Sequence, residues 1–415
     1  MVTIKYHKIR PEIFDNPILG RHLKAMRLYG YLIGDNQGYQ LWHFMRCTFL
    51  TFSILASCVL VIIKVSRGLD TISSDAISRA SAALLSATTF MVLNVYLQRK
   101  RVVTLINFIH EDMQKIRSCS DAKEDNILMG TIKYCRLVTI IMFILAVTTG
   151  SIACLDCYYR TIFLPDTVFN VPAVTQPIML FMVLPFGEVY DNFIIGWIGP
   201  NFEVVIVMLT IPIWHTFVVS LMNFLIFKIE IINKRLQDMD LTKMNPNLQS
   251  REEIGHLKAD EKTYWLLKMC ELQTCLFRFA EELQKLVGVP VFFDFIIFSL
   301  VFCFLFYSLT FGNYNKMEYC FLMLNVIALG TISLIYHWHA TLVTNCNDKM
   351  SFAIYSCDWY NYPVKVQKSI RLLMMQSSTP LIMRAIYVDL KISTFVDVIR
   401  GAYSYFSILR NSNVH

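Results

Sequence analysis

Six apolar stretches constrain the fold of this 415-residue chain more than any other feature. Each is long enough to cross a bilayer as a helix and contains no Asp, Glu, Lys or Arg. Because lipid offers no partner for peptide groups, a stretch of this kind must be helical there. Charged residues make up only 17% of the chain, against about 25% in soluble domains. The sequence therefore predicts an all-α, multi-pass membrane protein, with spans at about 47–63, 80–98, 137–155, 204–227, 295–312 and 319–346.

A seventh stretch, Ile392 to Leu409, is long enough to span but carries Asp397 and Arg400 near its middle. A charge in hydrocarbon costs several kcal/mol unless it meets a partner or water. Steps of four and three residues place a polar and small-residue stripe on one helical face. The stripe either lines an aqueous path or packs against neighbouring helices, and Asp397 and Arg400 either pair with each other or face water. Its members are Asp397, Gly401, Ser404, Ile408 and Asn411.

The distribution of Lys and Arg predicts the orientation of these seven spans. The N-terminus and the loops at 98–133, 228–268 and 345–391 share one side and carry 27 basic residues. The segments on the opposite side carry 6. Because basic residues are retained in the cytosol, we expect a cytosolic N-terminus and an extracellular C-terminus. A G-protein-coupled receptor has the opposite orientation.

Two charged amphipathic segments are predicted on the cytosolic side. One covers 252–287 and meets a break at Gly288–Pro290 before the fifth span, and the other covers 364–376 after Pro363. An amphipathic helix must bury its apolar face. We therefore expect a cytosolic helical bundle that holds subunits together, or helices that pack only within their own subunit.

Motifs of catalysis and metal binding are missing from the sequence. It has no GxxxxGK[ST], GxSxG or HExxH pattern, which disfavours an enzyme or an ATP-driven transporter. His337 and His339 lie two residues apart, about 200° around a helix, so they are not expected to share a metal ion. Cys154 and Cys157 lack the two further ligands that zinc would need. The prediction is a protein with no cofactor and no metal, which is not an enzyme.

The C-terminal residues carry a family resemblance. Tyr355-Ser-Cys-Asp-Trp-Tyr-Asn-Tyr-Pro363, followed by Lys368, Gln376 and Pro380, resembles the C-terminal signature of insect odorant receptors. The closing pattern that includes Thr394-Phe395 and Tyr403-Ser-Tyr-Phe406 is also similar, and Met26 to Gly30 resembles the family's N-terminal segment. The resemblance implies a ligand-gated, non-selective cation channel of four subunits in which the last helix lines the pore. The loop at 228–260 lacks the long insertion of the olfactory co-receptor, so the chain resembles an odorant-specific tuning subunit.

The resemblance also implies partners and a domain organisation. The partners would be the co-receptor in a heterotetramer, a small volatile odorant and the lipid bilayer of a sensory-neuron dendrite, with no nucleic acid. The cytosolic helices would anchor the tetramer. The expected regions are a cytosolic segment at 1–40, a six-helix ligand-binding region at 41–346 with extensions at 228–290, an anchor helix at 347–389, and a pore-lining helix at 390–415.

Carried onto this sequence, the resemblance assigns the hydrophobic gate to Ile408, one turn above Ser404. Ser407 and Asn411 lie nearby, with Asp397 lower on the same helix, and Gly401 either makes the helix more bendable or allows close packing. A ring of aliphatic side chains can close a pore by dewetting. The expected ligand pocket lies in the outer halves of spans two, three, four and six. Its candidates are Ser81, Leu84, Leu85, Ala146, Val147, Gly150, Ser151, Phe202, Val205, Met208, Phe321, Leu324 and Asn325, each of which could instead be a packing residue.

Two other classes remain as alternatives. A gustatory receptor would have a related fold and channel but tastant ligands. A G-protein-coupled receptor would have the opposite orientation and an Asp/Glu-Arg-Tyr motif at the inner end of span three. The inner end here is Lys133-Tyr-Cys-Arg136.

Overall fold

The computed structural model describes residues 11–28, 98–118, 122–163, 193–238, 253–312, 316–356, 359–361 and 364–412, with isolated positions between 45 and 88. Most of the first two predicted spans, 47–63 and 80–98, lies outside these residues. The described part is almost entirely helical, and its only strands are two short ones near the C-terminus.

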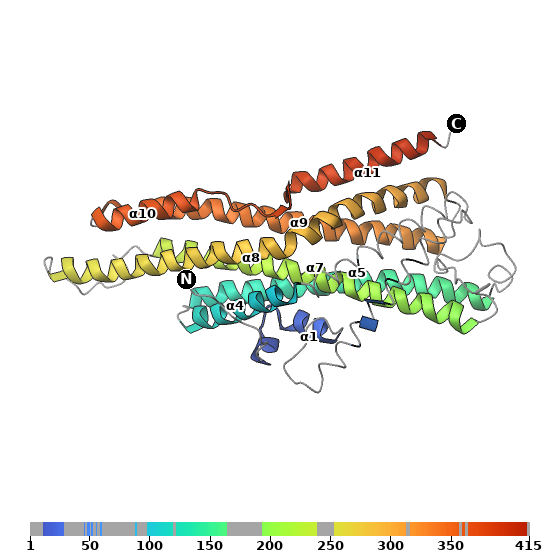
Figure 1. The fold of residues 1–415 in the computed structure, drawn as a ribbon, viewed down its shortest axis with the longest axis horizontal. Helices are drawn as coiled ribbons and strands as arrows, with labels where there is room; N and C mark the ends of the chain where they lie inside the picture. Colours follow the sequence, from blue (N-terminus) through green and yellow to red (C-terminus); the bar gives the residue numbers. More distant parts are fainter. Residues whose placement is uncertain are drawn as a thin grey trace.

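Four long helices run side by side along the long axis of the molecule (Figure 1). They are α5 (Ala122–Phe163), α7 (Phe193–Asp238), α8 (Glu253–Phe311) and α9 (Lys316–Ser356). Within the described residues, these four are the helices long and apolar enough to cross a membrane. They contain the spans expected at 137–155, 204–227, 295–312 and 319–346, which confirms the helical membrane fold.

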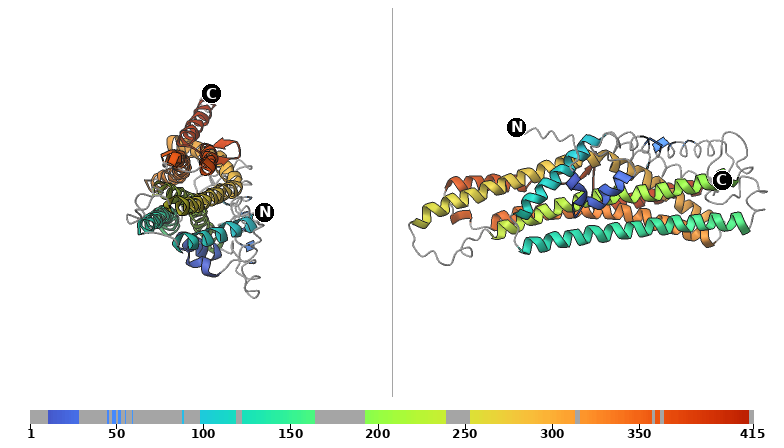
Figure 2. Two further views of the ribbon diagram at one scale, coloured as in Figure 1. Left: turned by 90° about the vertical axis from the view of Figure 1, so that its left-hand side faces the viewer. Right: turned by 90° about the horizontal axis from the view of Figure 1, so that it is seen from below.

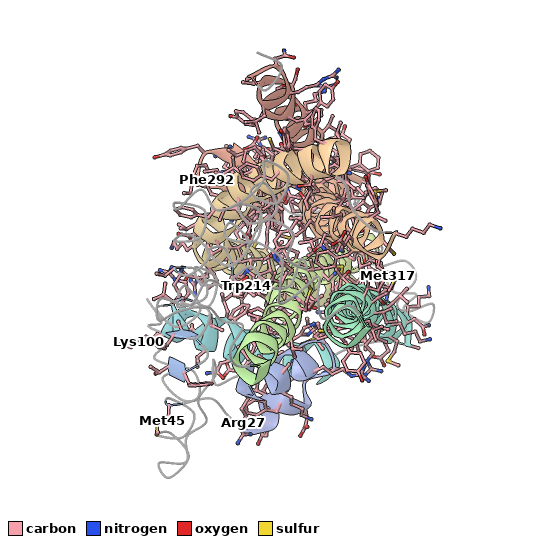
Figure 3. The ribbon with its side chains drawn as sticks, turned by 90° about the vertical axis from the view of Figure 1, so that its right-hand side faces the viewer. Arg27, Met45, Lys100, Trp214, Phe292 and Met317 are labelled. Carbon is pink, nitrogen blue, oxygen red and sulfur yellow. The ribbon has the colours of Figure 1, made fainter. Side chains whose placement is uncertain are left out.

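Helix α7 forms the core of the bundle. Of the 18 most apolar consecutive residues of α7, 89% are buried, whereas 28% of the corresponding residues of α5 are buried. Phe217, Phe224 and Phe227 of α7 are completely buried. A helix that is apolar on all sides must be covered by other helices or by lipid, and over this part of α7 other helices cover it. Viewed from the end of the bundle, Trp214 of α7 lies among the other helices (Figure 3).

The outer helices turn apolar side chains away from this core. On α5, Leu137, Ile140 and Ile144 are each about half exposed. Met323 and Ile327 of α9 are similarly exposed. These aliphatic surfaces would be unfavourable in water and are suited to lipid.

Helix α8 is continuous over 59 residues, with Pro290 inside it. The expected break at Gly288–Pro290 is therefore wrong. A proline in a helix removes one hydrogen bond and crowds the preceding turn, but packing on both sides can hold the helix together. Leu286, Val287 and Val291 are all buried and provide that packing. The cytosolic segment expected at 252–287 is thus the same rod as the fifth span.

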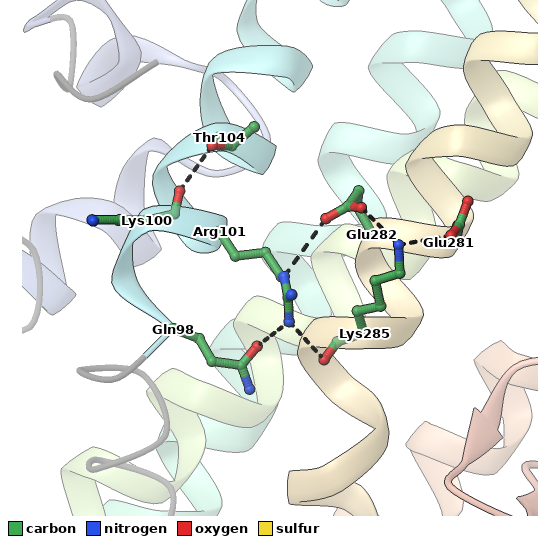
Figure 4. A network of polar contacts seen from close by, with 7 residues as sticks. All are labelled: Gln98, Lys100, Arg101, Thr104, Glu281, Glu282 and Lys285. Carbon is green, nitrogen blue, oxygen red and sulfur yellow. Dashed lines mark hydrogen bonds and ion pairs between the residues drawn. The ribbon is translucent and has the colours of Figure 1, made fainter. Parts of the chain in front are cut away.

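Helix α4 (Arg99–Ser118) is attached to α8 by a polar network (Figure 4). Arg101 donates to the side chain of Gln98 at 2.9 Å and to the backbone carbonyl of Lys285 at 3.4 Å, and pairs with Glu282 at 3.6 Å. Lys285 pairs with Glu281 at 2.7 Å and with Glu282 at 3.1 Å. Before α4 in the chain, η1 (Pro11–Asp15) packs against α4, and α1 (Gly20–Leu28) packs against η1 and α7.

Two ion pairs are buried where α7 meets its neighbours. Arg235 of α7 donates two hydrogen bonds of 2.8 Å to the two oxygens of Glu124 on α5. Lys228 of α7 lies 2.8 Å from Asp112 of α4 and also above the ring of Phe108. Both pairs lie towards the end of α7 that the Lys and Arg distribution assigns to the cytosol.

The segment after α9 packs on the cytosolic half of α8. It contains η4 (Trp359–Asn361), α10 (Val364–Ser377) and a hairpin of β1 (Arg384–Ala385) and β2 (Val388–Asp389). Helix α10 agrees with the helix expected at 364–376. Arg384 pairs with Asp389 and Ala385 with Val388 in the antiparallel hairpin.

Gln284 of α8 holds this hairpin by its side-chain amide. Its Oε1 accepts from the Arg384 backbone N–H at 2.8 Å, and its Nε2 donates to the Arg384 carbonyl. A side chain at Gly288 would meet that carbonyl at 3.3 Å, so glycine permits the close approach. The hairpin leads directly into α11 (Ile392–Ser412), the last helix, which lies at the edge of the bundle (Figures 1 and 2).

Candidate ligand cavity and pore helix

A small apolar cavity of about 50 Å³ lies between α5, α7 and α9. Its two polar side chains hydrogen-bond within their own helices: Thr149 donates to the Leu145 carbonyl at 2.8 Å and Asn325 to the Phe321 carbonyl at 2.9 Å. A molecule held here would bind mainly by burying apolar surface, at about 25 cal/mol per Å². The lining residues are Met142, Leu145, Ala146, Thr149, Met208, Ile211, Pro212, Asn325, Ala328, Leu329 and Ile332.

Of the residues proposed from sequence for the pocket, Ala146, Met208 and Asn325 line this cavity. Gly150 is buried, and Phe321 and Leu324 are half-buried, without lining it. Val147, Ser151 and Val205 are exposed on the outer surface. Ser81, Leu84 and Leu85 lie outside the described residues, and the side chain of Phe202 is not among those described.

Except for Thr149, which is next to the predicted Gly150, the other lining residues lie deeper in the bundle than the sequence suggested. Met142 is four residues before Ala146, and Pro212 is four residues after Met208, so each is one turn inward on the same helical face. Ile332 is about two turns inward from Asn325. Helical periodicity extended from Ala146, Met208 and Asn325 would have found these residues.

Helix α11 is attached through one narrow face. Val398, Ala402 and Phe406, at steps of four, are buried. Phe406 packs with Cys303 and Tyr307 of α8. At its base, the Ile392 backbone N–H donates to the Thr341 hydroxyl of α9 at 3.2 Å, and Phe395 lies beside the ring of His337.

The opposite face of α11 carries the polar stripe and is directed away from its own subunit. Asp397, Ser404, Ile408 and Asn411 are exposed, whereas Gly401 and Ser407 are intermediate. Within the described part of its own subunit, no other helix packs against the exposed residues of the stripe. A side chain at Gly401 would meet nothing within 4 Å, so packing within the subunit does not require glycine there.

Asp397 and Arg400 lie 3.6 Å apart as an i, i+3 pair, with side chains 63% and 77% exposed. Of the two arrangements left open by the sequence, the structure contains the pair. At the base of α11, Lys391 hydrogen-bonds Asp389 and holds the pKa of that carboxyl below its usual range, with Arg384 contributing. The start of the helix is therefore surrounded by ionised groups.

The histidines of α9 serve packing. The Nδ1 atoms of His337 and His339 lie 2.7 Å from the carbonyls of Ser333 and Ile335, each one turn back along the helix. Both rings are buried, and Trp338 between them is exposed. Among the described residues, no group of three His, Cys, Asp or Glu side chains could hold a metal ion.

The sequence matches the family model described as "7tm Odorant receptor" over residues 75–403. The chain belongs to the insect odorant receptor family. It is 41% identical to Odorant receptor 56a of Drosophila melanogaster over the full length of both chains. It is also 23% identical to Odorant receptor 10 of Aedes albopictus over 55% of this chain and 60% of that one. The odorant receptors are not a family of enzymes.

Solved insect olfactory receptors share the fold of this odorant receptor. The structure of the olfactory receptor OR5 from Machilis hrabei in complex with eugenol superposes with a TM-score of 0.80. The match covers 97% of this chain and all of the other at 12% identity. A second structure of the same olfactory receptor superposes with a TM-score of 0.77. The receptor therefore has the seven-helix membrane fold of the insect olfactory receptors. Its cytosolic N-terminus and extracellular C-terminus remain the prediction from the Lys and Arg distribution.

Proposed function

We propose that this odorant receptor is the odorant-specific subunit of a ligand-gated, non-selective cation channel. It assembles with the olfactory co-receptor into a heterotetramer in the plasma membrane of sensory-neuron dendrites. A small volatile molecule binds the cavity between α5, α7 and α9, and α11 lines the pore. The expected regions at 1–40, 41–346, 347–389 and 390–415 then correspond to a cytosolic segment, a ligand-binding bundle, an anchor and a pore helix.

The observation that carries the proposal is the exposed polar face of α11. Asp397, Ser404 and Asn411 lie on a helix whose other side is buried against α8. Asp397 pairs with Arg400, and Ser404 donates to the Arg400 carbonyl, but an exposed face of charged and polar groups is still costly against lipid. It is better accommodated by water or by another subunit. Four such last helices around one axis, contributed by this receptor and the co-receptor, would form a hydrated path. Ile408, 65% exposed on the same face, would contribute to an aliphatic constriction in it.

The cavity supports an apolar, compact ligand. Ala146 of α5, Met208 of α7 and Ile332 of α9 line it, and none of its described lining residues is charged. The relative from Machilis hrabei holds eugenol, a small volatile molecule, in the same fold. At about 50 Å³ the cavity is small, so a ligand would have to widen it by moving α5, α7 or α9. That movement is the means by which binding would reach the pore.

The proposal is tested by recording current from cells that lack G-protein signalling and express this receptor with the co-receptor. A panel of volatile alcohols, esters, ketones, terpenoids and phenols, including eugenol, is applied. We expect at least one volatile to evoke a cation current that neither subunit gives alone. A current that requires G proteins, or an N-terminal epitope tag that is accessible from outside the cell, would contradict the proposal.

Two neighbouring substitutions on α5 test the cavity. Ala146→Phe places a ring in a space of about 50 Å³, so we expect the evoked current to fall at least about tenfold. Val147→Phe is the matched control, because Val147 is 52% exposed on the outer face of the same helix. Equal responses from the two variants at equal surface expression would remove this cavity from the proposal.

A further inference from the structure

Three polar side chains from three helices converge inside the bundle. His215 of α7, Asp294 of α8 and Tyr336 of α9 are 2%, 6% and 4% exposed. The rings of His215 and Tyr336 meet edge to face with centroids 5.2 Å apart. His215 also lies 6.0 Å from the ring of Phe298, which is one turn beyond Asp294 on α8. Because Phe298 is one turn from Asp294, Asp294 lies on the face of α8 that is turned towards His215.

The cluster is incompletely hydrogen-bonded. Within the described part of the chain, Asp294 Oδ2, the Tyr336 hydroxyl and both ring nitrogens of His215 are buried without a hydrogen-bond partner. Leaving a buried polar group unpaired costs about 1–3 kcal/mol, and more if the group is charged. Replacement by apolar residues would avoid this cost, so polar groups at such positions inside a membrane indicate a function.

The cluster lies between the ligand cavity and the pore helix. His215 is four residues after Ile211 and Tyr336 is four residues after Ile332, so both lie one turn inward from the cavity lining. Tyr336 is followed by His337, whose ring contacts Phe395 of α11. On α8, Asp294 is on the same rod as Cys303 and Tyr307, which hold Phe406 of α11. The three helices that meet here include both helices to which α11 is attached.

We propose that His215, Asp294 and Tyr336 form a polar coupling site through which occupancy of the cavity changes the position of α8 and α9, and with them α11. The three residues are positioning residues and do not bind the odorant. A ligand that widens the space between α7 and α9 separates His215 from Tyr336 and changes the partners available to Asp294. Because unpaired groups have more than one possible partner, the cluster can adopt two arrangements, as a switch requires. This inference rests on the proposed function.

The test uses the triple variant His215→Leu/Asp294→Leu/Tyr336→Phe, in the full receptor co-expressed with the co-receptor. Replacing a whole buried polar cluster by apolar residues is often neutral or stabilising, so the variant should fold. Asp294→Asn and Tyr336→Phe are tested separately, because each removes one property and keeps the shape. Thr216→Val is the matched control, since Thr216 is buried on the same turn of α7 but bonds only to its own helix.

Four quantities are measured for each variant. They are surface expression, the resting inward current lost when external Na⁺ is replaced by N-methyl-D-glucamine, the dose response to the most effective volatile of the panel, and the thermal midpoint of the purified receptor. We expect the maximal evoked current per surface receptor to fall at least about fivefold in the triple variant and in Asp294→Asn, the low end of usual coupling strengths. The half-activating concentration should move less than the maximum, and the thermal midpoint should not fall.

A triple variant that reaches the surface and responds like Thr216→Val would overturn the coupling site while leaving the channel proposal intact. A shift of the half-activating concentration alone would assign the cluster to ligand binding and would also overturn the inference. Absence of any volatile-evoked current in the unmodified receptor would instead contradict the proposed function.

Discussion

Helices α7 and α11 are opposites within one chain. Helix α7 is buried among other helices at every residue from Thr210 to Ile229, and its Phe217, Phe224 and Phe227 are completely buried. Helix α11 touches its own subunit through the stripe that includes Val398 and Phe406, and exposes polar groups on the other side. The packing of α7 resembles the interior of a soluble protein. The exposed polar face of α11 resembles a surface that binds another subunit.

The difference separates stability from movement. A residue surrounded by many neighbours cannot shift without disturbing all of them, since protein interiors are packed to the density of organic crystals. A helix held along one narrow face can tilt or rotate at much lower cost. We therefore expect substitutions in α7 to change folding and substitutions on the outer face of α11 to change current with little effect on folding.

The largest effect is expected from Phe224→Ala. Phe224 is completely buried and packs edge to face against Phe279 of α8 at 5.4 Å. Removing a buried phenyl ring typically lowers the free energy of unfolding by about 3–5 kcal/mol. Tyr403→Ala, at a position of α11 that is 63% exposed, should change it by about 0.5 kcal/mol or less. The thermal midpoint of each purified receptor in detergent measures the difference, and equal midpoints would invalidate the comparison.

The two helices also differ in their ion pairs. Arg235→Leu would leave the buried carboxylate of Glu124 unpaired, which typically costs about 3–5 kcal/mol. The double variant Arg235→Leu/Glu124→Leu should recover most of the loss. Arg400→Leu breaks the exposed pair on α11 and should cost at most about 1 kcal/mol. A double variant no more stable than Arg235→Leu alone would show that the arginine acts through packing.

The third effect concerns pH at the interface of α1 with α5. His22 is buried with its Nε2 3.1 Å from the Thr139 hydroxyl, and burial lowers its pKa to about 4. In the unfolded chain its pKa is about 6.5, so between these values the unfolded state binds more protons. The free energy of unfolding should therefore fall as pH falls from about 6.5 to 4, by at most about 3 kcal/mol.

The measurement is the thermal midpoint at pH 7.5 and pH 5, compared between the unmodified receptor and His22→Gln. Glutamine can keep a hydrogen bond to Thr139 but does not titrate. The unmodified receptor should lose more stability on acidification than the variant. Identical losses would mean that other groups determine the acid sensitivity.

Ile408→Ala is expected to have the smallest effect on folding. It should nevertheless change the current clearly. Ile408 is 65% exposed within its own subunit, so the free energy of unfolding should change by about 0.5 kcal/mol or less. If its side chain closes the pore, the resting current should rise or the ion permeation should change. Ile408→Leu keeps an aliphatic ring and serves as control. Unchanged resting and evoked currents in the alanine variant would count against a gate at this position.

The sequence predicted the fold well because lipid leaves few choices. An uncharged apolar stretch such as 204–227 can only be a helix there, and the orientation followed from Lys and Arg alone. It did not predict that Pro290 would lie within a continuous helix, because packing of Leu286 and Val291 decides this and is not local. Similarly, the amphipathic character of the C-terminal helix identified the exposed stripe but not which neighbour covers Phe406.

The cavity was harder to predict for a related reason. In an apolar helix, residues facing the cavity and residues facing lipid have the same composition. Ala146 and Val147 are neighbours with similar side chains, yet one lines the cavity and the other is exposed. Only the rotation of α5 about its own axis distinguishes them. Contacts with α7 and α9 determine this rotation, and the sequence of α5 alone does not reveal those contacts.

The continuity of α8 through Pro290 has a mechanical consequence. At about 1.5 Å per residue, its 59 residues form a rod about 88 Å long. Gln284, which holds the hairpin that leads into α11, is about 47 Å from Glu253 and about 40 Å from Phe311. A tilt of about 5° around this point would move both ends by about 4 Å in opposite directions. Helix α8 can therefore tilt about the point where it holds the hairpin. A displacement of its cytosolic end, in the anchor region, would then move the membrane-spanning end against which α11 packs.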